Sequence, residues 1–319
     1  MNLLNRLRCV VLMSLPGFVP YVSAEIETRT VGYFDCTFLG NGDVLSSRPN
    51  SSSQRDWTAM QIACVERALG TWMDVLGIQD PTRNIRVALF WKDAPGVLAS
   101  AGSYWGNTVK KGTGTNAFSQ YSTAAEALWR DGYVDPLSAS ADRYDISITL
   151  SLSMFNSLYF GEDPGGILSW QYDMESFVLH EVGHCLGFSS RADAWSTNVF
   201  TAFDLSMKDA SGKPIGPKNN QYASGADYYA GSEGLLVYNP ANGSTGSKMS
   251  HLDSISSTYV MSPSLANGKI RRALTAQEIA LLREMGWQIG AAATIPEPAS
   301  ACLAVLGACV FVLRRRRAA

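Results

Sequence analysis

Residues 174–188 read MESFVLHEVGHCLGF, a run that predicts one helix with two histidines on the same side. His180 and His184 are four residues apart, and side chains at this spacing project from one face of an α-helix. Imidazole is a common neutral ligand for divalent metals, so both rings can reach one ion. Glu181 follows the first histidine, where its carboxylate can accept a proton from water that the ion activates. The run therefore predicts a helix that carries a metal site.

Signals at both ends set the bounds of this helix. Asp173 is the expected N-cap, and Glu175 lies near the positive end of the helix dipole. Gly187 is the expected stop, because glycine takes a left-handed conformation at little cost. The alternative interpretation is a core helix with two satisfied histidines and no metal. The flanking signals favour the metal site.

The chain has three histidines, and the third metal ligand is the open question. The pattern H-E-x-x-H-x-x-G-x-x-H would place that ligand at position 190, which is Ser190, a poor ligand for zinc. Asp193 lies three residues further on, and Glu233 or Glu278 would be a distant carboxylate ligand. We prefer His251 because it is the other imidazole in the chain.

A methionine supports the choice of His251. Met261 stands ten residues after it, in the sequence YVMSP at residues 259–263. A methionine turn beneath the metal accompanies H-E-x-x-H-x-x-G sites. The alternatives are a loop histidine without a role and an ordinary core methionine that fills a gap. Tyr259 is a candidate for stabilising an oxyanion, with a core tyrosine as the other interpretation.

With these residues, the chain resembles the metzincin superfamily of zinc endopeptidases, and in particular its leishmanolysin-like members, in which a long insertion separates HExxHxxGF from the last histidine. The resemblance implies one Zn²⁺ ion with ligands His180, His184 and His251. It also implies Glu181 as the general base and Met261 below the metal. The chain departs from the pattern at position 190, where many metzincins have histidine.

The resemblance also implies a fold and an activity. The expected fold is α+β, with an N-terminal mixed twisted sheet and two helices, and a loop-rich C-terminal subdomain that ends in a helix. The catalytic domain would span residues 25–290, divided into subdomains 25–188 and 189–290. The expected protein is a monomeric zinc endopeptidase that hydrolyses a protein or peptide substrate. The alternatives are a non-catalytic zinc-containing matrix or surface protein, and a metal hydrolase of a non-peptide substrate.

The N-terminal residues 1–24 have the composition of a secretory signal peptide. Arg6 and Arg8 precede an apolar run over residues 9–22, and Val-Ser-Ala at 22–24 forms a small-residue cleavage site. The alternative is a membrane anchor, but the run is short and contains two prolines. We expect the mature domain to be exported.

The C-terminal residues 291–319 contain a second targeting pattern. Pro-Glu-Pro at 296–298 is followed by an apolar run over 299–313 and by four arginines at 314–317. The run is short for a spanning helix, which needs about 20 residues. The order of the three parts resembles the PEP-CTERM sorting signal of bacteria, which implies a transient membrane anchor cut by a membrane sorting protease, and a final location in the cell envelope or extracellular matrix. A simple tail anchor is the alternative.

Processing would change the charge and the cysteine count. The signal peptide and the segment after Pro298 hold six of the 26 basic residues and no acidic residue, so 20 basic residues would face 28 acidic residues, a net charge of −8. A domain this acidic is not expected to bind nucleic acid. Three cysteines would remain. Cys36 and Cys64 are a candidate disulfide, while Cys185 is expected to be a buried apolar residue that points away from the ion. Cys36 is also the candidate for a thiol that blocks the metal in a latent form.

Periodicity predicts the remaining elements. A capping box at Thr275 and Glu278 starts a C-terminal helix over residues 275–286, which makes Glu278 a capping residue more readily than a ligand. The resemblance suggests that the strand at 145–152 or a neighbour lines the cleft and pairs with substrate. The other predicted elements are an amphipathic helix at 55–76, strands at 30–39, 84–91 and 96–104, and a surface loop at 106–120.

Overall fold

The computed structural model describes residues 26–44, 52–77, 84–94, 97–111, 113, 117–132, 144–191, 199–215, 223–242, 249–252 and 258–290. The expected signal peptide, the C-terminal sorting segment and Asp193 lie outside these residues. Within them, no helix is both long enough and apolar enough to cross a bilayer.

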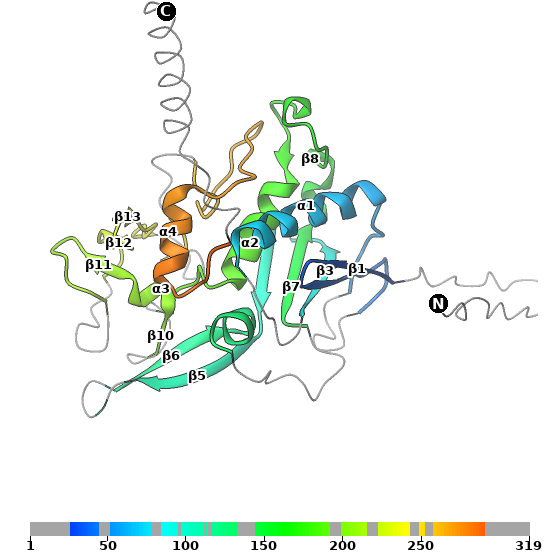
Figure 1. Cartoon of the computed structure of the whole chain (residues 1–319). Coiled ribbons are helices and arrows are strands. Elements are labelled where there is room, and N and C mark those ends of the chain that lie inside the picture. The colour runs from blue at the N-terminus through cyan, green and yellow to red at the C-terminus, as the bar shows by residue number, and fades with distance from the viewer. Residues whose placement is uncertain are drawn as a thin grey trace, which may run out of the picture.

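The main sheet has five strands in the order β1-β2-β3-β7-β4 and is mixed (Figure 1). Strand β3 pairs in parallel with β2 and β7, while β1 and β4 pair antiparallel at the two edges. The α+β class is therefore confirmed, and so are the predicted strands at 84–91 and 145–152. The strands are β1 (Glu27–Val31), β2 (Phe34–Phe38), β3 (Ile85–Lys92), β4 (Ala99–Ser103) and β7 (Ile146–Ser151).

One predicted strand is wrong in its extent. Residues 30–39 do not form a single strand, because the chain turns at Gly32 and Tyr33 and returns as an antiparallel hairpin. Gly32 has a φ of +56°, a left-handed conformation that glycine adopts without a steric cost. The hairpin adds β1 as an outer strand and leaves β2 next to the sheet centre.

Two helices pack together beside this sheet. Helix α1 (Ala59–Val75) begins at a capping box formed by Thr58 and Gln61. Helix α2 (Met174–Cys185) contacts α1 and also strands β4 and β7. The buried indole of Trp72 in α1 donates a hydrogen bond of 2.9 Å to the carbonyl of Leu179 in α2. This bond and the apolar core fix α2 against the sheet.

A second sheet occupies a region that the sequence predicts to be a loop. Strands β5 (Trp105–Lys111) and β6 (Phe118–Thr123) form an antiparallel hairpin, and β10 (Val199–Thr201) pairs in parallel with β6. Gly, Asn and Lys are depleted in strands, so the composition of residues 106–120 favoured a loop. The pairing with β6 and β10 overrides that preference. A π-helical turn, η2 (Glu126–Arg130), follows β6.

The C-terminal part contains short elements and ends in helix α4 (Ala276–Glu284). The predicted capping box of Thr275 and Glu278 is confirmed. Trp287 donates a hydrogen bond of 3.0 Å to the carbonyl of Leu186, so the chain end packs against the end of α2. The short elements are η3 (Leu152–Ser157), β8 (Leu158–Tyr159), η4 (Pro164–Gly166), β9 (Tyr172–Asp173), α3 (Ala202–Leu205), β11 (Met207–Asp209), β12 (Tyr228–Ala230) and β13 (Leu235–Leu236).

The candidate disulfide between Cys36 and Cys64 is wrong. Both thiols are free and buried in the main core, as is that of Cys185. Burial raises the pKa of Cys36 to about 12, with smaller contributions from Asp35 and Glu66. A neutral thiol at 1% exposure in the core cannot block a metal in the cleft, so the latent-form role proposed for Cys36 is also wrong.

Candidate metal centre

The start of α2 is fixed by its N-cap and by ion pairs. The carboxylate of Asp173 accepts hydrogen bonds from the backbone N–H of Ser176 (3.0 Å) and from its hydroxyl (2.6 Å), which confirms the predicted cap. Glu175 accepts a hydrogen bond of 2.7 Å from the Nε atom of Arg67 in α1. Both carboxylates lie near the positive end of the helix dipole. The helix therefore enters the core in one orientation.

The end of α2 lies just after the second histidine. Leu186 is the C-cap, and Gly187 has a φ of +111°, so the predicted stop is confirmed. The chain then folds back, and the carbonyl of Phe188 accepts a hydrogen bond of 2.6 Å from Nδ1 of His184. The turn at Gly187 thus orients one of the two imidazoles of the helix.

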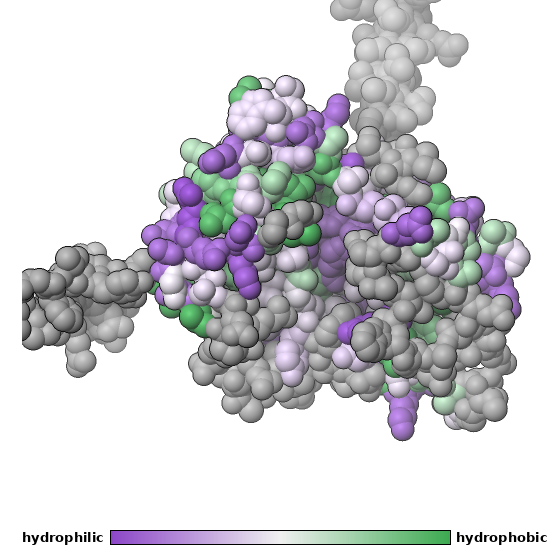
Figure 2. Space-filling view, turned by 180° about the vertical axis from the view of Figure 1, so that it is seen from behind, coloured by the Kyte–Doolittle hydropathy of each residue, from purple (hydrophilic) through white to green (hydrophobic). Residues whose placement is uncertain are grey.

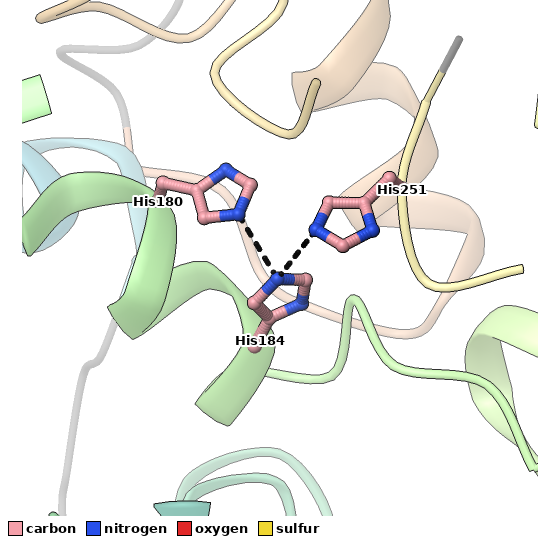
Figure 3. Close-up of side chains that lie close together, drawn as sticks. All are labelled: His180, His184 and His251. Atoms are coloured by element: carbon pink, nitrogen blue, oxygen red, sulfur yellow. Dashed lines mark hydrogen bonds between the residues drawn. The ribbon is translucent and has the colours of Figure 1, made fainter. Parts of the chain in front are cut away.

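The structure brings the three histidines together (Figure 3). Nε2 of His184 lies 3.0 Å from Nε2 of His180 and 3.1 Å from Nε2 of His251. His180 and His251 stack with an interplanar angle of 15°, and His184 lies edge-on to both rings. The ligand atoms all lie within 4.8 Å of one another, so a single ion can contact all three.

Backbone hydrogen bonds on two sides hold the segment that carries His251. Its carbonyl accepts a bond of 2.8 Å from the N–H of Tyr238, and the N–H of Leu252 donates one of 2.8 Å to the carbonyl of Met261. The segment at 249–252 is therefore held between residues 237–238 and the methionine turn. His251 itself is 7% exposed.

The tautomers of two of the rings follow from their partners. Nδ1 of His180 lies 2.7 Å from the carbonyl oxygen of Val260, and Nδ1 of His184 contacts that of Phe188. A carbonyl oxygen only accepts, so each Nδ1 carries the proton and each Nε2 presents a lone pair. The short Nε2–Nε2 contact between these rings, dashed in Figure 3, then has no proton to share. A cation among the three nitrogens would turn this repulsion into coordination.

The pKa values agree with neutral rings. Burial lowers the pKa of His180 to about 3, with a further contribution from His251. Burial also lowers the pKa of His184 well below its usual value, and the two neighbouring imidazoles add to this effect. Neutral imidazole is the form that binds metal. Three such nitrogens suit Zn²⁺ and the other late first-row divalent ions.

Glu181 lies between the helix and the edge strand β4. Its pKa is raised to about 7, chiefly by burial, while a hydrogen bond from the backbone of Ala101 acts in the opposite direction. Its side chain lines a cleft of about 520 Å³ together with all three histidines and strand β4. The face shown in Figure 2 is hollowed near its centre, with hydrophilic residues in its depth. A carboxyl that titrates near neutrality beside a metal site is suited to accept and return a proton.

Met261 packs against the backbone of α2 between the two ligands of the helix. A Cβ atom at Gly183 would lie 2.4 Å from Sδ of Met261, so only glycine fits there. The N–H of Met261 donates a hydrogen bond of 2.9 Å to Glu278. The methionine turn is therefore held between α2 and α4, and Met261 is fully buried.

Among the described residues, the other candidate ligands do not join the three histidines, and Asp193 lies outside these residues. Ser190 bonds to the buried carboxylate of Asp204, and its N–H donates a hydrogen bond of 2.9 Å to the hydroxyl of Ser250. Position 190 thus lies beside the segment that carries His251, which explains how a distant histidine can replace one at 190. Among the described residues, Glu233 is exposed in a turn and Glu278 is buried behind Met261, both outside the cluster.

Sequence reasoning missed one group of residues, and the structure decides between the two interpretations of Tyr259 in favour of a tyrosine packed against the core. The hydroxyl of Tyr259 donates a hydrogen bond of 2.8 Å to Gln277 and does not line the cleft, so it is not placed to stabilise an oxyanion. Arg271 does line the cleft, and Arg272 joins the ion pairs at the start of α2. The two adjacent arginines ahead of the capping box mark this segment in the sequence, but they do not indicate that it faces the cleft.

No protein-family model, curated protein or solved structure matches this chain. The interpretation of the site therefore depends on its own geometry: three convergent imidazoles and an adjacent buried carboxyl in an open cleft.

Proposed function

We propose that this chain is an exported zinc endopeptidase of metzincin type. The observation that carries the proposal is the position of Glu181, which lines the same cleft as the three imidazoles and has a pKa raised to about 7. Residues His180, His184 and His251 are the proposed ligands. The targeting patterns at the two ends support export, followed by sorting to the envelope or matrix by a membrane protease.

The residues of the chain fit the hydrolysis of a peptide bond. His180, His184 and His251 would hold the zinc ion, which when bound would supply Lewis acidity toward a water molecule and a carbonyl oxygen. Glu181 accepts the proton of the attacking water and returns it to the leaving amine. The backbone of Ala101 bonds to this carboxyl and keeps it directed into the cleft.

Strand β4 provides a place for an extended substrate. It is the last strand of the main sheet, so one of its two edges is not paired within that sheet. Residues 97–101 line the cleft beside the histidines. A peptide that adds to this edge would be held by backbone hydrogen bonds, which bind many sequences. The cleft thus suits an endopeptidase.

A purely structural zinc site is the competing interpretation. Such sites usually have a fourth protein ligand. In the described residues, the cluster of potential ligands contains three histidines and no fourth side chain. A structural site also has no use for a buried carboxyl beside the metal, whose desolvation opposes folding. Catalysis accounts for both features.

The replacement Glu181→Gln tests the proposal. We expect the variant to keep stoichiometric zinc and to lose cleavage of casein by at least about 100-fold, because a general base contributes roughly 10²–10⁴-fold. Glu233→Gln, which changes an exposed carboxylate in a turn, is the matched control and should leave cleavage unchanged. Cleavage by Glu181→Gln at the normal rate would refute the role of this residue. A zinc-loaded wild type that cleaves no protein would support the structural or non-peptide alternatives.

The ligand set is tested by His251→Ala. We expect zinc affinity to fall by more than about 100-fold, beyond the 10–100-fold typical of residues that only orient ligands. Asp193→Ala tests the ligand that sequence spacing left open, and we expect it to retain zinc. If His251→Ala kept zinc and Asp193→Ala lost it, the third ligand would be Asp193.

A further inference from the structure

The cleft contains one basic side chain that the proposed hydrolysis does not use. Among the described residues that line it, Arg271 is the only lysine or arginine, and Glu181 is the only aspartate or glutamate. The rest of the lining consists of the three histidines and of aliphatic, aromatic, proline and serine residues. A positive charge therefore faces a largely neutral cleft next to the proposed metal centre.

Hydrogen bonds to Ser176 and Ser264 help to hold Arg271 in place. Its backbone N–H donates to the hydroxyl of Ser176 at 2.7 Å, and its Nη1 donates to the carbonyl of Ser264 at 2.8 Å. Ser176 lies four residues before His180, on the same face of α2. Arg271 and His180 line the same cleft, so the guanidinium lies on the same open space as the proposed metal centre.

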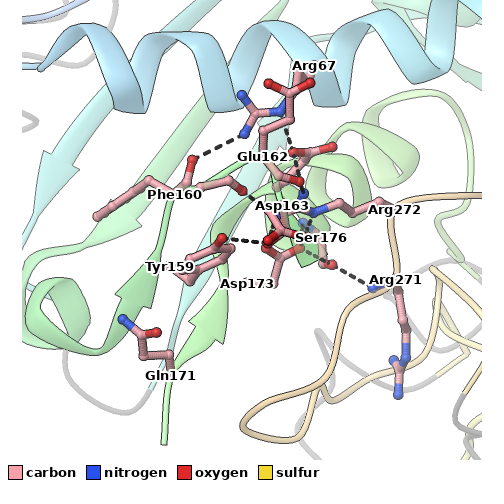
Figure 4. A network of polar contacts seen from close by, with 12 residues as sticks. Arg67, Tyr159, Phe160, Glu162, Asp163, Gln171, Asp173, Ser176, Arg271 and Arg272 are labelled. Atoms are coloured by element: carbon pink, nitrogen blue, oxygen red, sulfur yellow. Dashed lines mark hydrogen bonds and ion pairs between the residues drawn. The ribbon is translucent and has the colours of Figure 1, made fainter. Parts of the chain in front are cut away.

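The neighbouring arginine anchors this segment to α2 (Figure 4). Nε and Nη2 of Arg272 donate to the two carboxylate oxygens of Asp173, at 2.9 and 2.5 Å. Arg272 also lies 3.3 Å from Glu175 and donates to the carbonyls of Gly161 and Glu162. Asp173 is fully buried and caps the helix. The ion pairs with Asp173 and Glu175 thus hold the chain at residue 272 to the start of the metal helix.

The charge of Arg271 has a different setting from that of Arg272. In Figure 4 its side chain extends away from the carboxylates that surround Arg272. Among the described residues, the charge of Glu278 acts on Arg271, and this carboxylate is buried and accepts hydrogen bonds from Thr275 and Met261. Burial lowers the pKa of Arg271, but an arginine of this kind stays protonated. Its guanidinium has five N–H donors and matches a carboxylate geometrically.

We propose that Arg271 is a specificity determinant that binds a carboxylate of the peptide close to the bond to be cleaved. The proposal rests on the proposed endopeptidase function and specifies its substrate class. The carboxylate comes either from an aspartate or glutamate side chain or from the free C-terminus of a short peptide.

Binding to zinc-loaded Glu181→Gln protein tests this proposal without requiring cleavage. The probes are short fluorescent peptides of Ala, Gln and Ser in which one Gln is changed to Glu at successive positions, each made with a free or an amidated C-terminus. We expect a Glu at one position, or the free terminus, to tighten binding by roughly 10- to 100-fold, as hydrogen bonds to charged groups do. Dependence on Glu in the amidated peptides identifies a side chain, and dependence on the free terminus alone identifies a terminal carboxylate.

The same measurement on variants assigns the effect to Arg271. In the Glu181→Gln background, Arg271→Gln should abolish the preference, and Arg271→Glu should reverse it toward peptides with Lys. Arg283→Gln, which changes an exposed arginine on α4, should leave it intact. Equal binding of Glu and Gln peptides, or a preference that survives Arg271→Gln, would overturn the proposal. Selective binding by a wild type that cleaves none of these peptides would support the carboxylate site and contradict the endopeptidase function.

Discussion

At the scale of single residues, carbonyl groups that can only accept hydrogen bonds orient the imidazoles of the site. The carbonyl oxygens of Val260 and Phe188 can only accept, so they force the protons of His180 and His184 onto Nδ1. The opposite nitrogens are then left as lone pairs that face each other. This arrangement opposes folding unless a cation occupies the centre. The two carbonyls thus hold both rings in the tautomer whose Nε2 can bind a metal.

Gly183 is restricted by the close approach of Met261, and this restriction gives a prediction. In Gly183→Ala, the new Cβ would meet Sδ of Met261 and the ring of Trp72, so Met261 must move. We expect a net loss of about 1–3 kcal/mol in the free energy of unfolding, since overpacking outweighs the gain in helix propensity. Chemical denaturation of the metal-free protein measures this change.

Gly70 is the matched control for Gly183. It also lies within a helix, but a Cβ atom there would meet nothing within 4 Å. Gly70→Ala should therefore stabilise the protein by about 0.5–1 kcal/mol. Equal effects of the two replacements would show that Met261 does not pack tightly against α2.

At the scale of elements, α4 supports the metal helix through one peptide unit. The carbonyl of Val260 accepts a hydrogen bond from Nδ1 of His180, and the N–H of the same peptide, at Met261, donates to Glu278 at the start of α4. Glu278 also accepts hydrogen bonds from the backbone and hydroxyl of Thr275. The capping carboxylate of α4 therefore orients a candidate ligand on α2.

This connection predicts that Glu278 and Thr275 differ in their effect on metal binding. Glu278→Ala leaves the buried N–H of Met261 without its acceptor and releases the peptide that orients His180. We expect zinc affinity to fall by about 10–100-fold, as for other residues that orient ligands. Thr275→Ala removes only the cap, which costs about 1 kcal/mol of stability, and should leave zinc affinity within a few-fold of wild type. Competition with a chromophoric chelator measures both affinities, and equal losses would contradict the role of the peptide.

Sequence reasoning succeeded where a pattern is local. Asp173, Gly187 and the pair of Thr275 and Glu278 mark helix ends through their own chemistry, and all three ends are confirmed. It failed where pairing between distant segments decides the structure. Residues 106–120 have a loop-like composition, and pairing between β5 and β6 places residues 106–111 and 118–120 in strands.

The same distinction applies to the site. His180, Glu181 and His184 share one helix, so their spacing alone places them on a common site. His251 was preferred among several candidates, and its position depends on backbone bonds to residues 238 and 261 that no local pattern encodes. Arg271 was missed because an arginine in an irregular segment gives no sign of whether it faces solvent or a cleft.

At the scale of the whole molecule, the site joins segments from both halves of the described chain. Trp287 bonds to the end of α2, Arg272 to its start, and a β-bridge links Leu76 after α1 to Ile289. Residues 258–290 therefore contact both helices of the first half. Because the metal would connect α2 to His251, its binding free energy is expected to add to the stability of this whole arrangement.

The coupling between the site and global stability gives a pH prediction for the metal-free protein. The folded state lowers the pKa of His180 to about 3, whereas an unfolded histidine titrates near 6.5. The neutral ring therefore contributes stability above pH 6.5, and this contribution is lost as the pH falls toward 3, because the unfolded chain takes up a proton that the folded state excludes. In His180→Gln this linkage is absent. Below pH 6.5, we expect the free energy of unfolding of the wild type to fall relative to that of His180→Gln. The expected loss is up to about 1.4 kcal/mol for each pH unit. Urea denaturation in the presence of a chelator measures it, with Arg283→Gln as a control whose difference should not vary with pH. A constant difference for His180→Gln would show that the ring is not shielded from protons in the folded state.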